Sequence, residues 1–192
     1  MSAPSLLLSA FAPELAGLDR EPPAGWVVAT AGIGAVTAAV ETARLIREHR
    51  PARLLFVGTC GAYDGRLAVG DVVAAARAIA TSVEEAEGRA YRPAAEILEW
   101  PATWVLPLPA HGVAVPPAIT LTEAGARSLS RIAPAEHLEL SGVLAACAVA
   151  AVPAAAVLGV ANRVGPGAHL EWKRENARVS ARVVETIRGV LG

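Results

Sequence analysis

The segment from residue 26 to residue 58 most constrains the fold, because an apolar run, an amphipathic stretch and a second apolar run follow one another. The first run, WVVAT, ends in the glycines of AGIGAV, and the last, LLFV, leads into GTCGAY. Between them Val36, Val40 and Ile46 recur among charged residues at the spacing of an amphipathic helix. A strand, a helix and a strand of these lengths predict a parallel βαβ unit with a right-handed crossover.

The remaining segments continue this alternation. Further strands are predicted within residues 5–11, 70–90 and 153–162, and helices within 121–134, 142–151 and 169–191. Residues 91–117 are rich in proline and tryptophan, which predicts loops with one or two short elements near a pocket or a partner surface. We therefore predict one domain over residues 1–192, with three α/β/α layers around a mixed, mostly parallel sheet.

The composition excludes several classes of protein. Hydrophobic residues make up 54% of the chain and charged residues 18%, and the formal net charge is −1. No broad basic surface is therefore expected for nucleic acid or for an anionic membrane. Cys60 and Cys147 lie far apart, which predicts two buried reduced thiols in the cytoplasm rather than a metal site or a redox pair.

One stretch, residues 140–160, approaches the length of a membrane span. Gly142, Pro153 and Gly159 interrupt it, so a buried helix, a turn and a buried strand are predicted instead. The amino terminus is apolar, but it lacks a basic segment and Glu14 interrupts it, so we predict a first strand rather than a signal peptide.

Two glycine segments, AGIGAV and GTCGAY, follow predicted strands. Ligands bind at the carboxyl edge of such sheets, and glycine lets backbone N–H groups approach a polar ligand. A dinucleotide fingerprint fits poorly, because Thr37 stands at the position of the third glycine and no acidic residue ends the next strand. Glycines that serve only as tight turns remain the simpler interpretation of either segment alone.

Together with Glu14, LELSG and VAN, the two segments stand in an order that resembles the nucleoside phosphorylase and nucleosidase superfamily. FAPEL, AGIGAVTAA, VGTCGAY…LAVGDVV and HLELSGVLAACAVAAVPAAAVLGVAN are similar to segments of that family and together cover most of the chain. The resemblance implies its α/β fold and cleavage of the N-glycosidic bond of a small-molecule purine nucleoside, with no cofactor and no metal. It also implies a homodimer or a higher homo-oligomer, for which residues 100–104 are a candidate surface.

The resemblance assigns roles to individual residues. Glu14 matches the glutamate that positions or deprotonates the attacking water, and Glu139 matches the glutamate that binds the ribose hydroxyls. Asn162 stands where many members carry an aspartate that protonates purine N7. An amide can instead donate to N7 and O6 of a 6-oxopurine, which favours hypoxanthine or guanine over adenine.

Four further residues are expected to contact the substrate. Gly61 and Ala62 would lie close to the nucleoside, Gly34 belongs to the first glycine segment, and Leu138 takes the place of a methionine that packs on the ribose. Phe56 stands where similar phosphorylases carry an arginine, and neither glycine segment is basic, so water is the expected nucleophile rather than phosphate.

Among the hydrolases of this family, GTCGAY, ANRVG and EWKREN look most like futalosine hydrolases, which release hypoxanthine in menaquinone synthesis. Two alternatives remain: a methylthioadenosine/adenosylhomocysteine nucleosidase, and a nucleoside-binding protein without turnover. The second follows from departures from the family pattern, namely His137 for a glutamate, Leu138 for a methionine, Leu158 for a frequent arginine and Ala161 for a serine.

Overall fold

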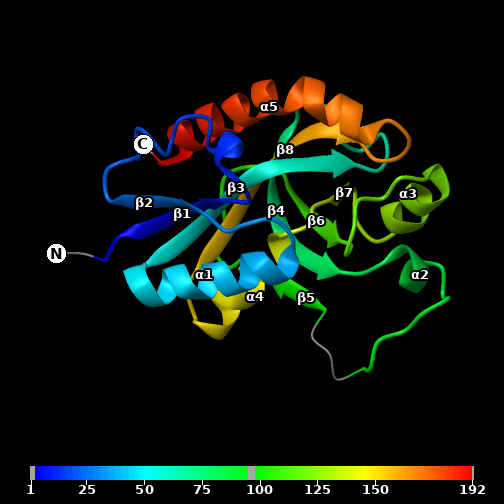
Figure 1. Cartoon of the computed structure of the whole chain (residues 1–192), viewed down its shortest axis with the longest axis horizontal. Helices are drawn as coiled ribbons and strands as arrows, with labels where there is room; N and C mark the ends of the chain where they lie inside the picture. The colour runs from blue at the N-terminus through cyan, green and yellow to red at the C-terminus, as the bar shows by residue number, and fades with distance from the viewer. Residues whose placement is uncertain (1–2, 95–97, 192) are drawn as a thin grey trace.

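The computed structural model describes residues 3–94 and 98–191 as an eight-stranded sheet between helices (Figure 1). The strands are β1 (Ser5–Ser9), β2 (Trp26–Thr30), β3 (Arg53–Ala62), β4 (Val72–Ala80), β5 (Glu99–Pro101), β6 (Ala110–Val115), β7 (Ala135–Glu136) and β8 (Ala154–Arg163). The helices are the 3-10 turn η1 (Ala12–Leu15), α1 (Ala35–His49), α2 (Val83–Ala86), α3 (Glu123–Ser130), α4 (Leu140–Val149) and α5 (Ala168–Leu191).

The sheet is mixed and mostly parallel, as predicted. Strands β2, β1, β3 and β8 lie side by side and parallel. Strand β4 runs antiparallel to β8 and parallel to β6, while β5 and β7 add short antiparallel pairings. The carboxyl ends of β1, β2, β3 and β8 therefore meet at one edge of the sheet, which is where α/β proteins bind ligands.

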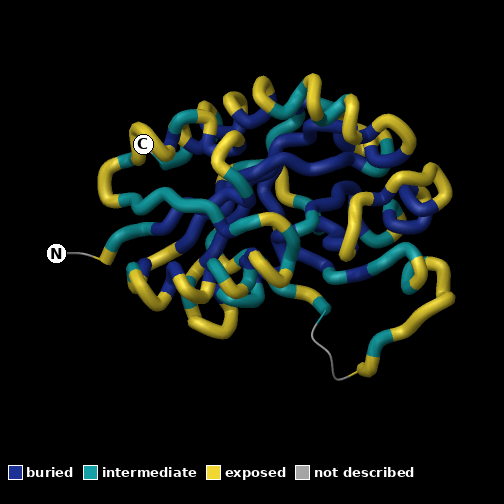
Figure 2. The backbone as a smooth tube through the Cα atoms, viewed as in Figure 1, coloured by how far each residue is buried: buried dark blue, intermediate teal, exposed yellow. Residues whose placement is uncertain are grey.

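Helices cover both faces of the sheet, which confirms the three-layer prediction. Alternate side chains of β1 and β3 enter two separate cores: Leu6 and Leu8 pack with residues of α1 and α4, while Leu7 packs with residues of α5. Figure 2 shows the buried strands between helices whose outer surfaces are exposed. Strands buried on both faces explain the continuous apolar runs in the sequence.

The apolar face predicted for α1 is confirmed at Ile46 and wrong at its two valines. Val36 and Val40 are exposed, and the helix buries Ala38, Thr42 and Leu45 together with Ile46. The reason is a close crossing with α4, where a side chain on Gly142 would overlap the backbone carbonyl of Ala35. Only small residues allow the two helices to approach this closely, so the valines face outward.

The prediction of a glycine turn at GTCGAY is also wrong. Strand β3 continues through residues 58–62, pairing with β8 as far as Ala62 and with β7 at Gly61 and Ala62. The pairing register with β8 shifts once, between Cys60 and Gly61. These glycines are therefore strand residues whose missing side chains leave space at the sheet edge.

The other predicted elements are confirmed within a few residues. The described part of residues 91–117 carries the short strands β5 and β6, and residues 140–160 form α4, a turn and most of β8. The sequence did not predict η1, α2 or β7, which are too short to show a periodic pattern. No helix in the described ranges is long and apolar enough to cross a membrane.

Candidate active site

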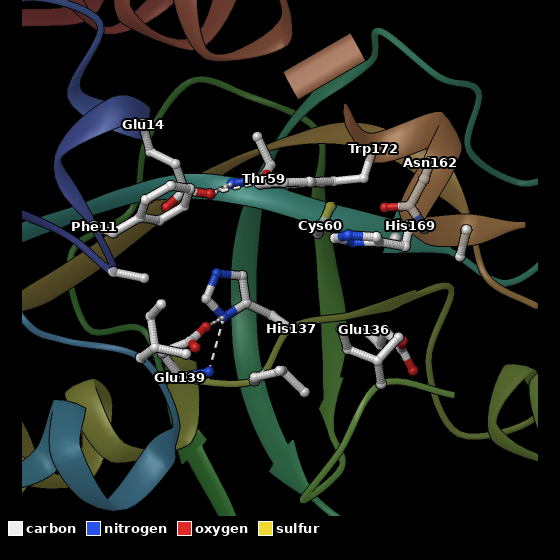
Figure 3. A pocket seen from close by; sticks show the side chains of 16 residues that line it. Phe11, Glu14, Thr59, Cys60, Glu136, His137, Glu139, Asn162, His169 and Trp172 are labelled. Atoms are coloured by element: carbon white, nitrogen blue, oxygen red, sulfur yellow. Dashed lines mark hydrogen bonds and ion pairs between the residues drawn. The ribbon is translucent and has the colours of Figure 1, made fainter. Parts of the chain in front are cut away.

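A cavity of about 290 Å³ lies at the carboxyl edge of the parallel strands. It is lined by residues of η1, the end of β3, the connection from β7 to α4, the end of β8 and the first turn of α5 (Figure 3). This is the edge at which the sequence predicts ligand binding.

Glu14 is the buried carboxylate at one end of the cavity. It sits in η1, directly after β1, and is only 4% exposed. Its Oε1 accepts hydrogen bonds from the Thr59 backbone N–H at 2.8 Å and from the Thr59 hydroxyl at 2.7 Å, whereas Oε2 is buried without a partner among the described residues. Burial raises its pKa to about 7, against the opposing effect of the Thr59 hydrogen bonds. Such a group exchanges a proton near neutral pH, as a general base must.

Thr59 orients this carboxylate through a directional chain of hydrogen bonds. The Trp172 indole N–H, on α5, donates to Thr59 Oγ1 at 3.0 Å, so the Thr59 hydroxyl proton is available to Glu14. The structure places Trp172 in the cavity wall. The role of Thr59 had no sequence signal beyond its position between the two glycines.

Thr59→Val is expected to move the acid limb of the pH–rate profile upward by about one pH unit. The substitution keeps the β-branched shape but removes a hydrogen bond that stabilises ionised Glu14, and a bond to a charged group contributes roughly 1.5–3 kcal/mol. Activity near neutral pH should fall about tenfold and recover at higher pH. Thr42→Val, which removes a buried unpartnered hydroxyl on α1, is the matched control. An unchanged limb in Thr59→Val would contradict this role.

Glu139 and His137 form a second buried group at the start of α4. Glu139 Oε1 accepts a 2.8 Å hydrogen bond from the Gly34 N–H at the start of α1, and its Oε2 lies 3.2 Å from His137 Nδ1. The Glu139 backbone N–H donates to the same Nδ1 at 3.1 Å. Burial lowers the pKa of His137, partly offset by the charge of Glu139, so the imidazole is neutral at physiological pH.

Asn162 and Glu136 flank Gly61 at the other end of the cavity. Gly61 pairs with Asn162 of β8 on one side and with Glu136 of β7 on the other. A side chain on Gly61 would lie 2.6 Å from Val164 and 3.1 Å from the Asn162 amide nitrogen, so only glycine leaves this floor open. Glu136 Oε2 accepts from the Tyr63 hydroxyl at 2.9 Å and Oε1 from the Thr120 N–H at 3.2 Å.

One N–H of the Asn162 amide already has a hydrogen-bond partner. Its Nδ2 donates to the Arg163 carbonyl at 2.9 Å, and Figure 3 shows its oxygen turned toward Cys60. Donation to both N7 and O6, as predicted from the sequence, would need both N–H bonds. One N–H and the carbonyl oxygen remain for a ligand, so the side chain offers one donor and one acceptor.

The structure brings together most of the predicted site residues. Glu14, Glu139, Asn162, Gly61 and Leu138 all line the cavity. The predictions for Gly34 and Ala62 need correction, because neither residue is among those lining the cavity.

The first correction concerns Gly34, whose N–H holds Glu139 in place. The second concerns Ala62, which points into the core because successive strand residues face opposite sides of a sheet.

Aromatic side chains form part of the cavity wall. Phe11 and Trp172 lie 6.0 Å apart, and His169 stacks on Trp172 at 5.9 Å with 9° between the rings. All three come from outside residues 91–117, the segment expected to lie near a pocket or a partner surface. No described residue of that segment lines the cavity, and residues 95–97 lie outside the described residues.

The cavity offers little to a phosphate or a metal ion. Neither lysine nor arginine is among its described lining residues, and Phe56 is fully buried, edge-on to His137. The described residues contain no group of three acidic, histidine or cysteine side chains placed to hold a metal ion. Burial raises the pKa of Cys60 to about 12, so this thiol is not a nucleophile near neutral pH.

The sequence model of the phosphorylase superfamily matches residues 25–124, more than half of the chain. The chain belongs to the phosphorylase superfamily. No curated protein sequence matches it.

Solved structures share the fold of this phosphorylase-superfamily chain over nearly its whole length. A futalosine hydrolase mutant of Helicobacter pylori strain 26695 superposes with a TM-score of 0.86 and 14% identity, covering 99% of both chains. A methylthioadenosine/adenosylhomocysteine nucleosidase of H. pylori gives 0.87 and 14% over 100% and 99%. The same kind of enzyme from Neisseria meningitidis gives 0.83 and 19% over 99% of both chains.

Proposed function

We propose that this protein hydrolyses the N-glycosidic bond of a purine nucleoside. The observation that carries the proposal is the Glu14 carboxylate, buried at the cavity with one unpartnered oxygen and a pKa raised to about 7 by burial. A free buried carboxylate oxygen is costly, and a group of this pKa is suited to take a proton from a bound water.

The chemistry divides between the two ends of the cavity. Glu139 accepts hydrogen bonds from the ribose hydroxyls and its charge favours the positive charge that develops on the sugar. Glu14 takes a proton from water as the water oxygen bonds to the anomeric carbon. The bond from that carbon to N9 breaks, and its electron pair leaves with the base. The free N–H of Asn162 donates to N7 or O6 and stabilises the negative charge on the departing base.

Water is the proposed nucleophile, because phosphorolysis needs cationic side chains around the phosphate. The cavity has no lysine or arginine among its described lining residues, and its one buried unpartnered acceptor, Glu14 Oε2, would repel a phosphate.

A 6-oxopurine is the proposed base, and Glu136 supplies the discrimination. An amide such as Asn162 also matches N7 and the 6-amino group of adenine. Glu136, beside Gly61, presents a carboxylate that accepts from the N1–H of a 6-oxopurine but repels the N1 lone pair of adenine. Futalosine hydrolase, releasing hypoxanthine, is therefore the best proposal, and the similarity to a structure of that enzyme supports it.

Glu136→Gln is expected to reduce the preference for 6-oxopurine over adenine nucleosides about tenfold to a hundredfold. The glutamine amide can donate to N1 of adenine, which removes the repulsion on which the preference rests. The measurement is the ratio of kcat/KM values for paired substrates with the same sugar. Glu123→Gln, on the exposed side of α3, is the control and should keep the ratio. A ratio unchanged in Glu136→Gln would contradict this assignment.

A methylthioadenosine/adenosylhomocysteine nucleosidase is the second candidate, favoured by the equal similarity to solved enzymes of that kind. Incubation of the protein with futalosine, inosine, methylthioadenosine and adenosylhomocysteine, followed by chromatography of the bases, separates the candidates. Hypoxanthine from futalosine supports the leading proposal, and adenine release supports the second. Nucleoside binding without any release would support a binding protein without turnover.

We further propose a cytoplasmic homodimer that works without a cofactor. Ile33 and Ile119 line the cavity yet are 65% and 49% exposed, and Val36 and Val40 of α1 add further exposed apolar surface. A second copy of the chain would cover such a surface beside the cavity mouth. The molar mass in solution tests this assembly.

A further inference from the structure

A gap separates Glu14 from His137, and Gly58 forms its floor. A side chain on Gly58 would place its Cβ 3.2 Å from Glu14 Oε2 and 3.2 Å from His137 Nε2. Glu14 Oε2 and His137 Nε2 are therefore separated by at most twice the 3.2 Å Cβ distance. No direct hydrogen bond joins these two atoms in the described structure. A water that bonds to both atoms can join them when they lie up to about 5.6 Å apart, a separation that the two Cβ distances permit.

The hydrogen bonds of His137 determine which of its nitrogens carries the proton. The Glu139 backbone N–H is a fixed donor aimed at Nδ1, so Nδ1 must accept, and the neutral ring carries its proton on Nε2. Glu139 Oε2, at 3.2 Å from Nδ1, would favour the opposite tautomer. The backbone donor determines the tautomer of His137, because the Glu139 carboxylate can rotate toward a ribose hydroxyl and a backbone N–H cannot.

We propose that His137 Nε2–H and Glu14 Oε2 together hold the attacking water in the space that Gly58 leaves open. This inference rests on the proposed hydrolysis and assigns a role to a residue at which the chain departs from its family's pattern. In Figure 3 the imidazole lies between Glu14 and Glu139. Phe56, whose ring centre lies 5.3 Å from that of His137 in a T-shaped contact, fixes its orientation.

Both lone pairs and one hydrogen of the bridging water have a partner in this arrangement. One lone pair of the water accepts from Nε2–H, one hydrogen donates to Glu14 Oε2, and the other lone pair attacks the anomeric carbon. As the carbon–oxygen bond forms, the proton passes to Glu14 and the electron pair of the glycosidic bond leaves with the base. The Nε2–H bond fixes the position of the water oxygen, so that its second lone pair points at the anomeric carbon.

Two substitutions of His137 separate water positioning from packing. His137→Ala should lower kcat about a hundredfold with KM little changed, because a lost donor to a transition state has an effect of this size. His137→Gln places an amide N–H near the position of Nε2 and should restore activity to within about tenfold of the unmodified protein. Equal losses in both variants, with equally lowered thermal stability, would assign His137 a structural role and overturn the proposal.

Gly58→Ala tests the space itself. Gly58 does not have a positive φ, so alanine is compatible with its backbone, but the methyl would lie only 3.2 Å from both Glu14 Oε2 and His137 Nε2 and would exclude the proposed water. We expect kcat to fall at least a hundredfold while the free base still binds. Gly112→Ala, in β6, is the matched control, because the nearest atom to its new methyl would lie 3.5 Å away. Full activity in Gly58→Ala would overturn the proposal.

Nitrogen-15 NMR of His137 tests the inference whether or not the protein turns over a nucleoside. We expect a protonated Nε2 and an unprotonated Nδ1 at neutral pH. A crystal structure should show a water between Glu14 and His137 that is absent in Gly58→Ala. A proton on Nδ1, or a dry gap, would overturn the proposal even in an active enzyme. A bound water with no base release from any nucleoside would instead overturn the proposed function.

Discussion

Glu14→Gln is expected to lower kcat for base release by about three orders of magnitude, with KM changed little. The amide keeps the size of the side chain and can still accept from Thr59, but it cannot take a proton from water. In the unmodified protein kcat/KM should rise with pH up to about 7 and then level off, as Glu14 ionises. The other titratable side chains that line the cavity are those of His137, His169, Glu139, Glu136 and Cys60, and the rise should disappear only when Glu14 is replaced.

The same substitution should stabilise the fold above neutral pH. The folded pKa of Glu14, about 7, lies above the unfolded value of 4.5, so the folded state retains a proton that the unfolded chain has released. The free energy of unfolding therefore falls as the pH rises from 4.5 to about 7, by about 3 kcal/mol. Glu14→Gln removes this loss, so its Tm at pH 8 should exceed that of the unmodified protein. Retained activity, or a lower Tm at pH 8, would contradict the assignment of Glu14 as a buried base.

Glu139→Gln should lower kcat/KM about a thousandfold, through a higher KM as well as a lower kcat. The amide can still accept from the Gly34 N–H, so the start of α1 should keep its place. It lacks the negative charge that binds ribose hydroxyls strongly and favours the charged sugar in the transition state. The variant and the unmodified protein are compared in initial rates and in the Kd for the free base.

The free base controls for damage to the other end of the cavity, since it is proposed to contact Asn162 and not Glu139. Its Kd should change less than twofold in Glu139→Gln. A large loss of affinity for the free base would mean that Glu139 supports the cavity as a whole rather than the ribose.

The architecture was predictable because each central strand is buried on both faces. Runs such as LLFV, separated by helices of regular period, permit few arrangements other than a covered, mostly parallel sheet. The exposed face of α1 was not predictable, because its orientation depends on a crossing with α4 that Gly142 permits. A helical period fits either face until the neighbouring helix is known.

The site was predictable where a residue acts through its own chemistry and not where it acts through a neighbour. Glu14, Glu139 and Asn162 followed from the resemblance, and the structure brings them to one cavity. Thr59 and His137 act through hydrogen bonds to residues distant in the sequence or through a space between strands. The glycines of GTCGAY were noticed for the right property, absence of a side chain, but were assigned to a turn when they belong to a strand.

The most direct test of the central claim is the sugar product formed from futalosine with and without inorganic phosphate. The cavity contains the buried general base Glu14 and no cationic residue among its described lining residues. It therefore predicts hypoxanthine and free sugar, formed at a rate that phosphate does not change. Formation of a sugar 1-phosphate, or no release of hypoxanthine by the folded protein, would contradict it.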